Sequence, residues 1–232
     1  MILITSPISY GLIALVCFLG YLRTRGEKEN KVVFYFNKLY FWFSLYGLHW
    51  MIVSIITLIT KANFPFSWQT YPLGHLLAFI ALAYGIRIGL YTLNIKPKIS
   101  SLIIALYSLI VGTGLVINII YPSLLTFKDY GYVFIDANDL VGRLFTFPLG
   151  IAVLFLAVIF WWQGLKKLTD PLARKKAMFI AATFSIIALG APIRNIFEGF
   201  YIAVISEFSL TLGMIIVVAS LFLKEKKEEK GK

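Results

Sequence analysis

The chain contains seven apolar stretches of about twenty residues, separated by short polar breaks. A helix needs about 20 apolar residues to cross ~30 Å of hydrocarbon, so each stretch is long enough to span a bilayer. The stretches cover residues 2–22, 34–60, 72–93, 100–121, 140–163, 176–193 and 200–223. We therefore predict an all-α polytopic membrane protein, with one bundle of seven transmembrane helices over 1–223 and a short charged cytoplasmic tail over 224–232.

Composition agrees with a membrane location and excludes other classes. Only 14% of the residues are charged and 59% are hydrophobic, whereas soluble domains carry about a quarter charged residues. A net charge of +11 would suggest nucleic acid in a soluble protein, but here we expect it to orient helices beside membrane lipid. The single Cys17 lies inside the first apolar stretch, which excludes an intramolecular disulfide and a cysteine-based metal site.

Basic residues are distributed unevenly among the polar breaks. The first, third and fifth breaks and the tail together carry sixteen Lys and Arg, and the other three breaks carry three. Because cytoplasmic loops are enriched in Lys and Arg, we predict a multi-pass protein of the cell membrane with its N-terminus outside and its C-terminus inside. The start of the chain lacks a basic segment, so we expect a retained first helix rather than a signal peptide.

Glu207 is the polar residue that most needs an explanation. It falls ~10 Å below the outer boundary of the last stretch, where a lipid-facing charge costs several kcal/mol. At 100° per residue, one face of that helix carries Phe200, Ala203, Glu207, Thr211 and Met214. We expect this face to line the interior, with Glu207 as its central charge.

Other polar groups also map to the outer half of the bundle. These are His49, His75, Asn118, Arg143 and Arg194, and with Glu207 and Thr211 they are our candidate ligand-binding residues. Structural alternatives stay open for each of them. The histidines suit interhelical hydrogen bonds, and Asp139–Arg143 and Arg194–Glu198 have the i, i+4 spacing of helix-end ion pairs. Glu207 itself suits a buried pair with Arg143 or Arg194.

Several kinds of site cannot be built from this sequence. The last stretch has no lysine before Lys224, so a retinal Schiff base has no attachment point. The chain has two histidines, too few for the three-histidine zinc site of seven-helix membrane hydrolases. It contains neither HExxH nor a GxxxxGK[ST] phosphate loop. We expect a non-enzyme without a metal or cofactor.

The stretch KKLTDPLARKKAMFIAATFSIIALG (166–190) resembles a recurrent segment of the seven-helix N-terminal sensor regions of prokaryotic histidine kinases and related archaeal signalling proteins. In those regions Asp-Pro is followed by a basic cluster that opens the sixth helix. The resemblance implies a sensing role. Since no output domain follows in this sequence, it also implies a signal that passes to a separate chain. The candidate partner-binding residues are Lys166, Lys167, Arg174, Lys175 and Lys176.

The leading hypothesis is a receptor-like membrane sensor with an outward-facing polar pocket and a separate cytoplasmic signalling partner. One alternative is a small transporter coupled through Glu207, because small transporters are often built from two three-helix repeats. Pro7 and Pro148 occupy roughly corresponding positions in two such halves, although neither is followed by Gln. A further alternative is a structural subunit of a larger membrane complex.

Overall fold

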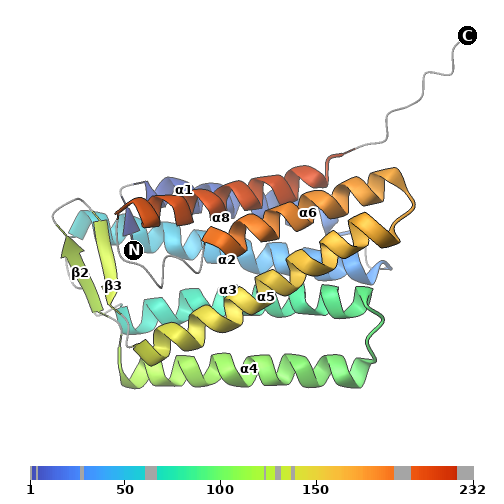
Figure 1. The fold of residues 1–232 in the computed structure, drawn as a ribbon. Helices are drawn as coiled ribbons and strands as arrows, with labels where there is room; N and C mark the ends of the chain where they lie inside the picture. Colours follow the sequence, from blue (N-terminus) through green and yellow to red (C-terminus); the bar gives the residue numbers. More distant parts are fainter. Residues whose placement is uncertain are drawn as a thin grey trace, which may run out of the picture.

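The computed structural model describes residues 2–3, 5–26, 29–60, 67–122, 124–128, 132–136, 139–190 and 200–223. The tail over 224–232 and Arg194 lie outside these ranges. Within them the chain is a bundle of antiparallel helices with a small sheet at one end (Figure 1).

Seven long α-helices account for the seven apolar stretches. They are α1 (Ser6–Thr24), α2 (Lys31–Thr60), α3 (Ser67–Thr92), α4 (Pro97–Ile120), α5 (Asp139–Trp162), α6 (Pro171–Gly190) and α8 (Phe200–Ser220). A π-helical turn, η1 (Gln163–Lys167), extends α5. Five of these helices, α1 to α5, are long and apolar enough to cross a membrane, and α8 holds a shorter apolar segment, Val204–Ser220. The helical prediction is confirmed, and the apolar lengths support a membrane protein.

A three-stranded antiparallel sheet, which the sequence analysis did not predict, covers one end of the bundle. Its strands are β1 (Ile2–Leu3), β2 (Leu124–Lys128) and β3 (Tyr132–Asp136), in the order β1-β3-β2. Leu125 pairs with Ile135, and Ile2 pairs with Val133. The N-terminal segment thus pairs with the long α4–α5 connection. We call this end of the bundle the sheet end.

The opposite end collects the basic residues, and we call it the basic end. The α1–α2, α3–α4 and α5–α6 connections all lie there (Figure 1). Its described cations are Arg23, Arg25, Lys31, Lys96, Lys98, Lys166, Lys167, Arg174, Lys175 and Lys176. Because the number of long helices is odd, the start of α1 and the end of α8 lie at opposite ends of the bundle.

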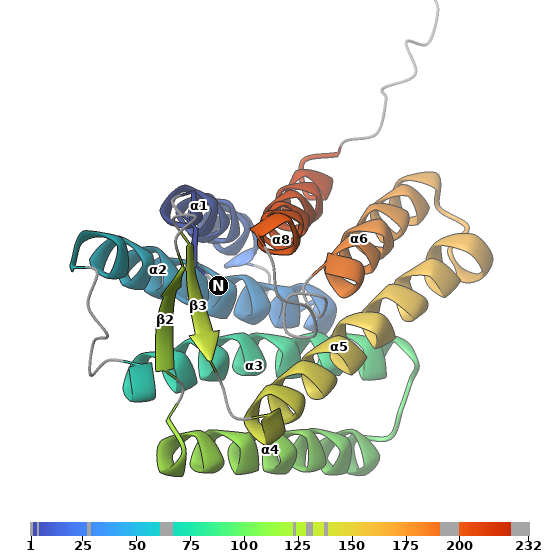
Figure 2. The same ribbon diagram turned by 60° about the vertical axis from the view of Figure 1, so that its left-hand side comes forward.

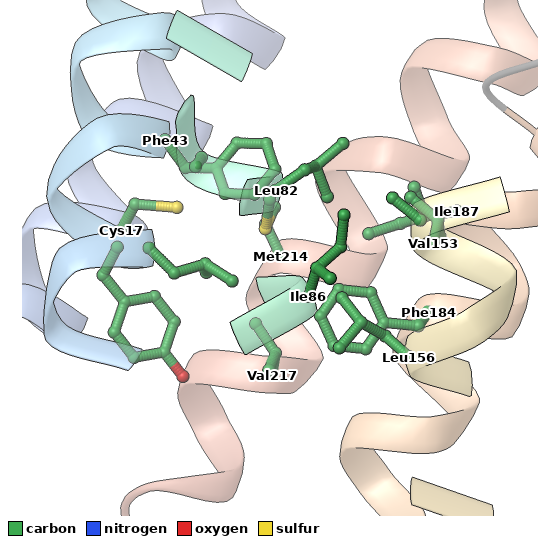
Figure 3. Close-up of a cluster of buried hydrophobic side chains, with 14 of the residues drawn as sticks. Cys17, Phe43, Leu82, Ile86, Val153, Leu156, Phe184, Ile187, Met214 and Val217 are labelled. Atoms are coloured by element: carbon green, nitrogen blue, oxygen red, sulfur yellow. The ribbon is translucent and has the colours of Figure 1, made fainter. Parts of the chain in front are cut away.

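Six of the helices converge on an apolar centre. Figure 3 shows side chains from α1, α2, α3, α5, α6 and α8 pointing toward one another, among them Cys17, Phe43, Leu82, Leu156 and Met214. The seventh helix, α4, is outermost and packs on α3 and α5 (Figure 2). Many of its apolar side chains face outward, with Leu102 70% exposed and Leu109 66% exposed. Such exposure is costly in water and ordinary in lipid.

Helix α6 begins five residues before the apolar stretch that predicted it. Asp170 precedes Pro171 and caps the first turn, since its Oδ2 accepts a hydrogen bond from the backbone N–H of Ala173 at 2.6 Å. Proline suits the first helical position because its missing N–H is not needed there. As a result Arg174 and Lys175 project from the first turns of α6 and not from a loop.

Candidate functional site

Glu207 is buried between the last helix and the first. It lies about 10 Å along α8 and is 5% exposed. The hydroxyl of Ser6, in the first turn of α1, donates a hydrogen bond to Glu207 Oε1. The prediction that Glu207 faces the interior is confirmed. The predicted alternative that Glu207 pairs with Arg143 is wrong, because Arg143 lies in a groove between α3, α4 and α5. Arg194 lies outside the described residues.

The buried face of α8 continues past Glu207 toward the basic end. Met214 is 2% exposed, as the predicted helical face requires. Thr211 is half-buried, and its Oγ1 is buried with no hydrogen-bond partner among the described residues. The side chains of Phe200 and Ala203 are not described. Two polar groups one turn apart, Glu207 and Thr211, therefore lie inside the bundle on the last helix.

An aromatic cluster fills the sheet-end half of the bundle around Trp50 of α2. The Trp50 ring stacks with Tyr10 of α1 at 6.1 Å between centroids and meets Tyr71 of α3 edge-on at 6.3 Å. Its indole N–H is buried and has no hydrogen-bond partner among the described residues. A buried indole usually finds such a partner, so Trp50 presents an unused donor to its surroundings.

Both histidines belong to this cluster and contact Trp50. His49 Nε2 donates a hydrogen bond to the carbonyl of Thr70 on α3 at 2.9 Å, which confirms the predicted interhelical role. His75 instead bonds within its own helix, where Nδ1 donates to the Tyr71 carbonyl at 3.0 Å. The His75 ring stacks on Phe145 of α5, with 4.6 Å between the ring centroids.

Helix α1 connects Glu207 to the aromatic cluster. Ser6 and Tyr10 are one turn apart on the same buried face, so the partner of Glu207 and the partner of Trp50 are neighbours. We define the sheet-end cluster as Ser6, Tyr10, His49, Trp50, Tyr71, His75 and Glu207. The sequence analysis missed Ser6, Tyr10, Trp50 and Tyr71. Ser6 and Tyr10 could have been found from their spacing in the sequence. They begin a series with helical spacing that is buried on α1: Ser6, Tyr10, Ile13, Cys17, Gly20 and Thr24.

Asn118 and Arg143 occupy different surroundings. Asn118 is fully buried on α4, on the same face as Val111 and Gly114. A Cβ added to Gly114 would lie 2.9 Å from the Phe145 ring, so this face packs directly on α5. Arg143 is exposed on α5 and lines the apolar groove. The side chain of Asp139, its predicted ion-pair partner, is not described.

The predicted partner-binding residues form a basic surface at the basic end. Lys166, Lys167, Arg174 and Lys175 are exposed and Lys176 is half-buried. Lys167 Nζ lies 4.9 Å from the centroid of the Trp162 ring, an arrangement that attracts the ammonium to the ring face. These side chains are accessible to lipid headgroups and to another protein.

The sheet-end cluster combines a carboxyl group, hydroxyls and aromatic rings, groups that form hydrogen bonds and stacking contacts. No protein-family model, curated protein or solved structure matches the chain.

Proposed function

We propose that this chain is a seven-pass sensor of the cell membrane, with its N-terminus outside. The sheet-end cluster would receive the signal and the basic end would pass it on. The charge distribution supports this orientation, because most of the described cations lie at the end opposite the sheet, with Lys128 and Arg143 as exceptions. Helices α6 and α8 would complete the seven crossings, since they run side by side with the five helices that are long and apolar enough to cross a membrane (Figure 1).

The buried Ser6–Glu207 hydrogen bond is the observation that carries the proposal. A carboxyl group inside the membrane is costly and is usually retained for function. Here it joins the last helix to the first, beside an aromatic cluster whose Trp50 indole N–H has no hydrogen-bond partner in the described part of the chain. A ligand that hydrogen-bonds to Glu207 would compete with Ser6 and so change how α8 packs on α1.

A route from α8 to the basic end follows from the packing. Helix α8 lies between α1 and α6 (Figure 2). Its contact with α6 is close, because a Cβ added to Gly213 would lie 2.7 Å from Ile187. A shift of α8 would therefore move α6, whose first turns carry Arg174 and Lys175. The resemblance of 166–190 to prokaryotic sensor regions supports a cytoplasmic partner at this surface.

Transport coupled through Glu207 is the second candidate function. The buried Thr211 hydroxyl favours it, because Ser6, Glu207 and Thr211 form a polar line that leads inward along α8. The apolar centre of Figure 3 interrupts that line, since Met214 and Val217 follow on the same helix and are 2% exposed. A transporter would have to open this layer, whereas a sensor needs only a shift of packed helices.

Proteoliposomes that enclose a pH-sensitive dye separate the two functions. Under an imposed pH gradient, a sensor leaves the proton leak equal to that of empty vesicles, and a proton-coupled transporter raises it. Glu207→Gln would abolish a coupled flux but would leave a passive leak unchanged. For the sensor, compounds that raise the Tm of the wild-type protein should fail to do so for Glu207→Gln. If every stabilising compound acts equally on both proteins, Glu207 is not part of the receiving site.

A further inference from the structure

An apolar groove of about 420 Å³ runs along the periphery of the bundle between α3, α4 and α5. It arises because α5 crosses α3 and α4 obliquely, so these three helices cannot remain in contact along their whole length (Figure 2). Its walls include Leu90 of α3, Leu106 and Ile110 of α4, and Phe147 and Ile151 of α5. A volume of this size lies within the range of roughly 300–1,000 Å³ that small-molecule sites occupy.

The groove wall is almost wholly apolar, and one charged residue lies at its sheet end. Among its lining residues Arg143 is the charged one, and it is exposed near the start of α5 at the sheet end. Phe155 lines the groove twelve residues further along the same helix, at ~18 Å. One leaflet of a bilayer is about half of the ~30 Å hydrocarbon thickness. The groove therefore spans about the depth of a single lipid chain.

We infer that this groove binds one hydrocarbon chain of an anionic phospholipid, whose phosphate contacts Arg143. The apolar walls exclude a hydrated ligand, and the narrow volume suits one chain better than a helix of another protein. Arginine is suited to the head because its planar fork donates two parallel hydrogen bonds to a phosphate. The site is separate from the sheet-end cluster, and it requires only that the bundle sits in a membrane.

Native mass spectrometry of the full chain, released from nanodiscs of equal parts phosphatidylglycerol and phosphatidylcholine, tests this site. The wild-type protein should retain phosphatidylglycerol, and Arg143→Gln should lower the retained phosphatidylglycerol-to-phosphatidylcholine ratio about fivefold. Arg143→Lys keeps the charge and should lower this ratio less than Arg143→Gln does. The comparison between variants removes the contribution of the basic end, because Lys166 and its neighbours are unchanged.

A second pair of variants tests the chain-binding half of the groove. Leu106 lines it and is 58% exposed, while Leu109 is exposed to a similar degree on the same helix and does not line it. Leu106→Trp should fill the groove and reduce retained phosphatidylglycerol, and Leu109→Trp should not. Equal lipid ratios for the wild-type protein and Arg143→Gln, or equal retention by the two tryptophan variants, would overturn the assignment.

Discussion

Ser6 and Glu207 are 201 positions apart in the chain, and the hydroxyl of the first donates a hydrogen bond to the carboxyl group of the second. Both side chains are buried. The contact joins the first turn of α1 to the sheet-end half of α8, next to the aromatic cluster around Trp50. The proposed sensing role depends on this hydrogen bond between the first and last helices.

Removing either partner should destabilise the bundle, and the two effects should not add. Ser6→Ala should lower the free energy of unfolding by about 1–3 kcal/mol, because a buried acceptor loses a hydrogen-bond donor. Glu207→Met removes the same bond from the other side. In a double-mutant cycle measured by unfolding in detergent, we expect a coupling energy of about 1 kcal/mol or more. Additivity within about 0.5 kcal/mol would show that the two residues do not interact.

The close approach of α1 and α2 at Gly47 should not tolerate a side chain. A Cβ at this position would lie 2.6 Å from the backbone N of Ala14 and 2.8 Å from the carbonyl O of Tyr10. Gly47→Ala should therefore cost about 1–3 kcal/mol of stability through overpacking. Gly112→Ala is the matched control, because no atom lies within 4 Å of its added Cβ. It should instead stabilise α4 by up to about 1 kcal/mol.

If no ligand binds at Thr211, the protein should be more stable with an apolar residue at this position. The buried hydroxyl of Thr211 has no hydrogen-bond partner in the described part of the chain, so Thr211→Val should raise stability by about 1 kcal/mol. Thr24→Val is the opposite case. Its Oγ1 donates to the Gly20 carbonyl at 2.8 Å and accepts from Asn37 Nδ2 at 3.1 Å. Thermal unfolding of the two variants should move in opposite directions, and a loss of stability in both would contradict the prediction.

The proposed orientation predicts which end of the bundle reacts with an impermeant maleimide. In a Cys17→Ala background, Thr60→Cys, at the sheet-end terminus of α2, should be labelled on intact cells. Lys98→Cys at the basic end should be labelled only after the membrane is permeabilised. Both positions are exposed, so access to the reagent decides the outcome. The reverse pattern would place the N-terminus inside and would move the sheet-end cluster to the cytoplasmic side.

The apolar stretches predicted the helices well because crossing a bilayer requires a minimum length of apolar helix from each of them. The boundaries moved where local chemistry prevailed, as at Pro171, where the Asp170 cap starts α6 before its apolar run. Strand β1 was missed because it depends on pairing between Ile2–Leu3 and Tyr132–Asp136, a contact between distant segments, whereas β2 and β3 are close in the sequence. The alternating pattern of β-branched and aromatic residues in β3 was the local signal of that strand.

The candidate site was predicted less completely than the fold. Helical spacing placed Glu207 and Met214 on a buried face, because that depends on one helix alone. The partner of Glu207 depends on which helices are neighbours, and the spacing within one helix carries no information about that. Arg143 was therefore one of two alternative partners considered for Glu207, with Arg194, although the oblique crossing of α5 places it in the groove at the periphery of the bundle.

The central claim is that the sheet-end cluster controls the basic end. Pulsed electron paramagnetic resonance tests it most directly, with spin labels at two exposed positions, Arg25 at the end of α1 and Lys175 in α6. These two helices flank α8 (Figure 2). In a Cys17→Ala background, Glu207→Met should change the distribution of distances between the labels. Leu109→Met, on the outward face of α4, should leave it unchanged. Superimposable distributions for the Glu207→Met protein and its parent would contradict the account.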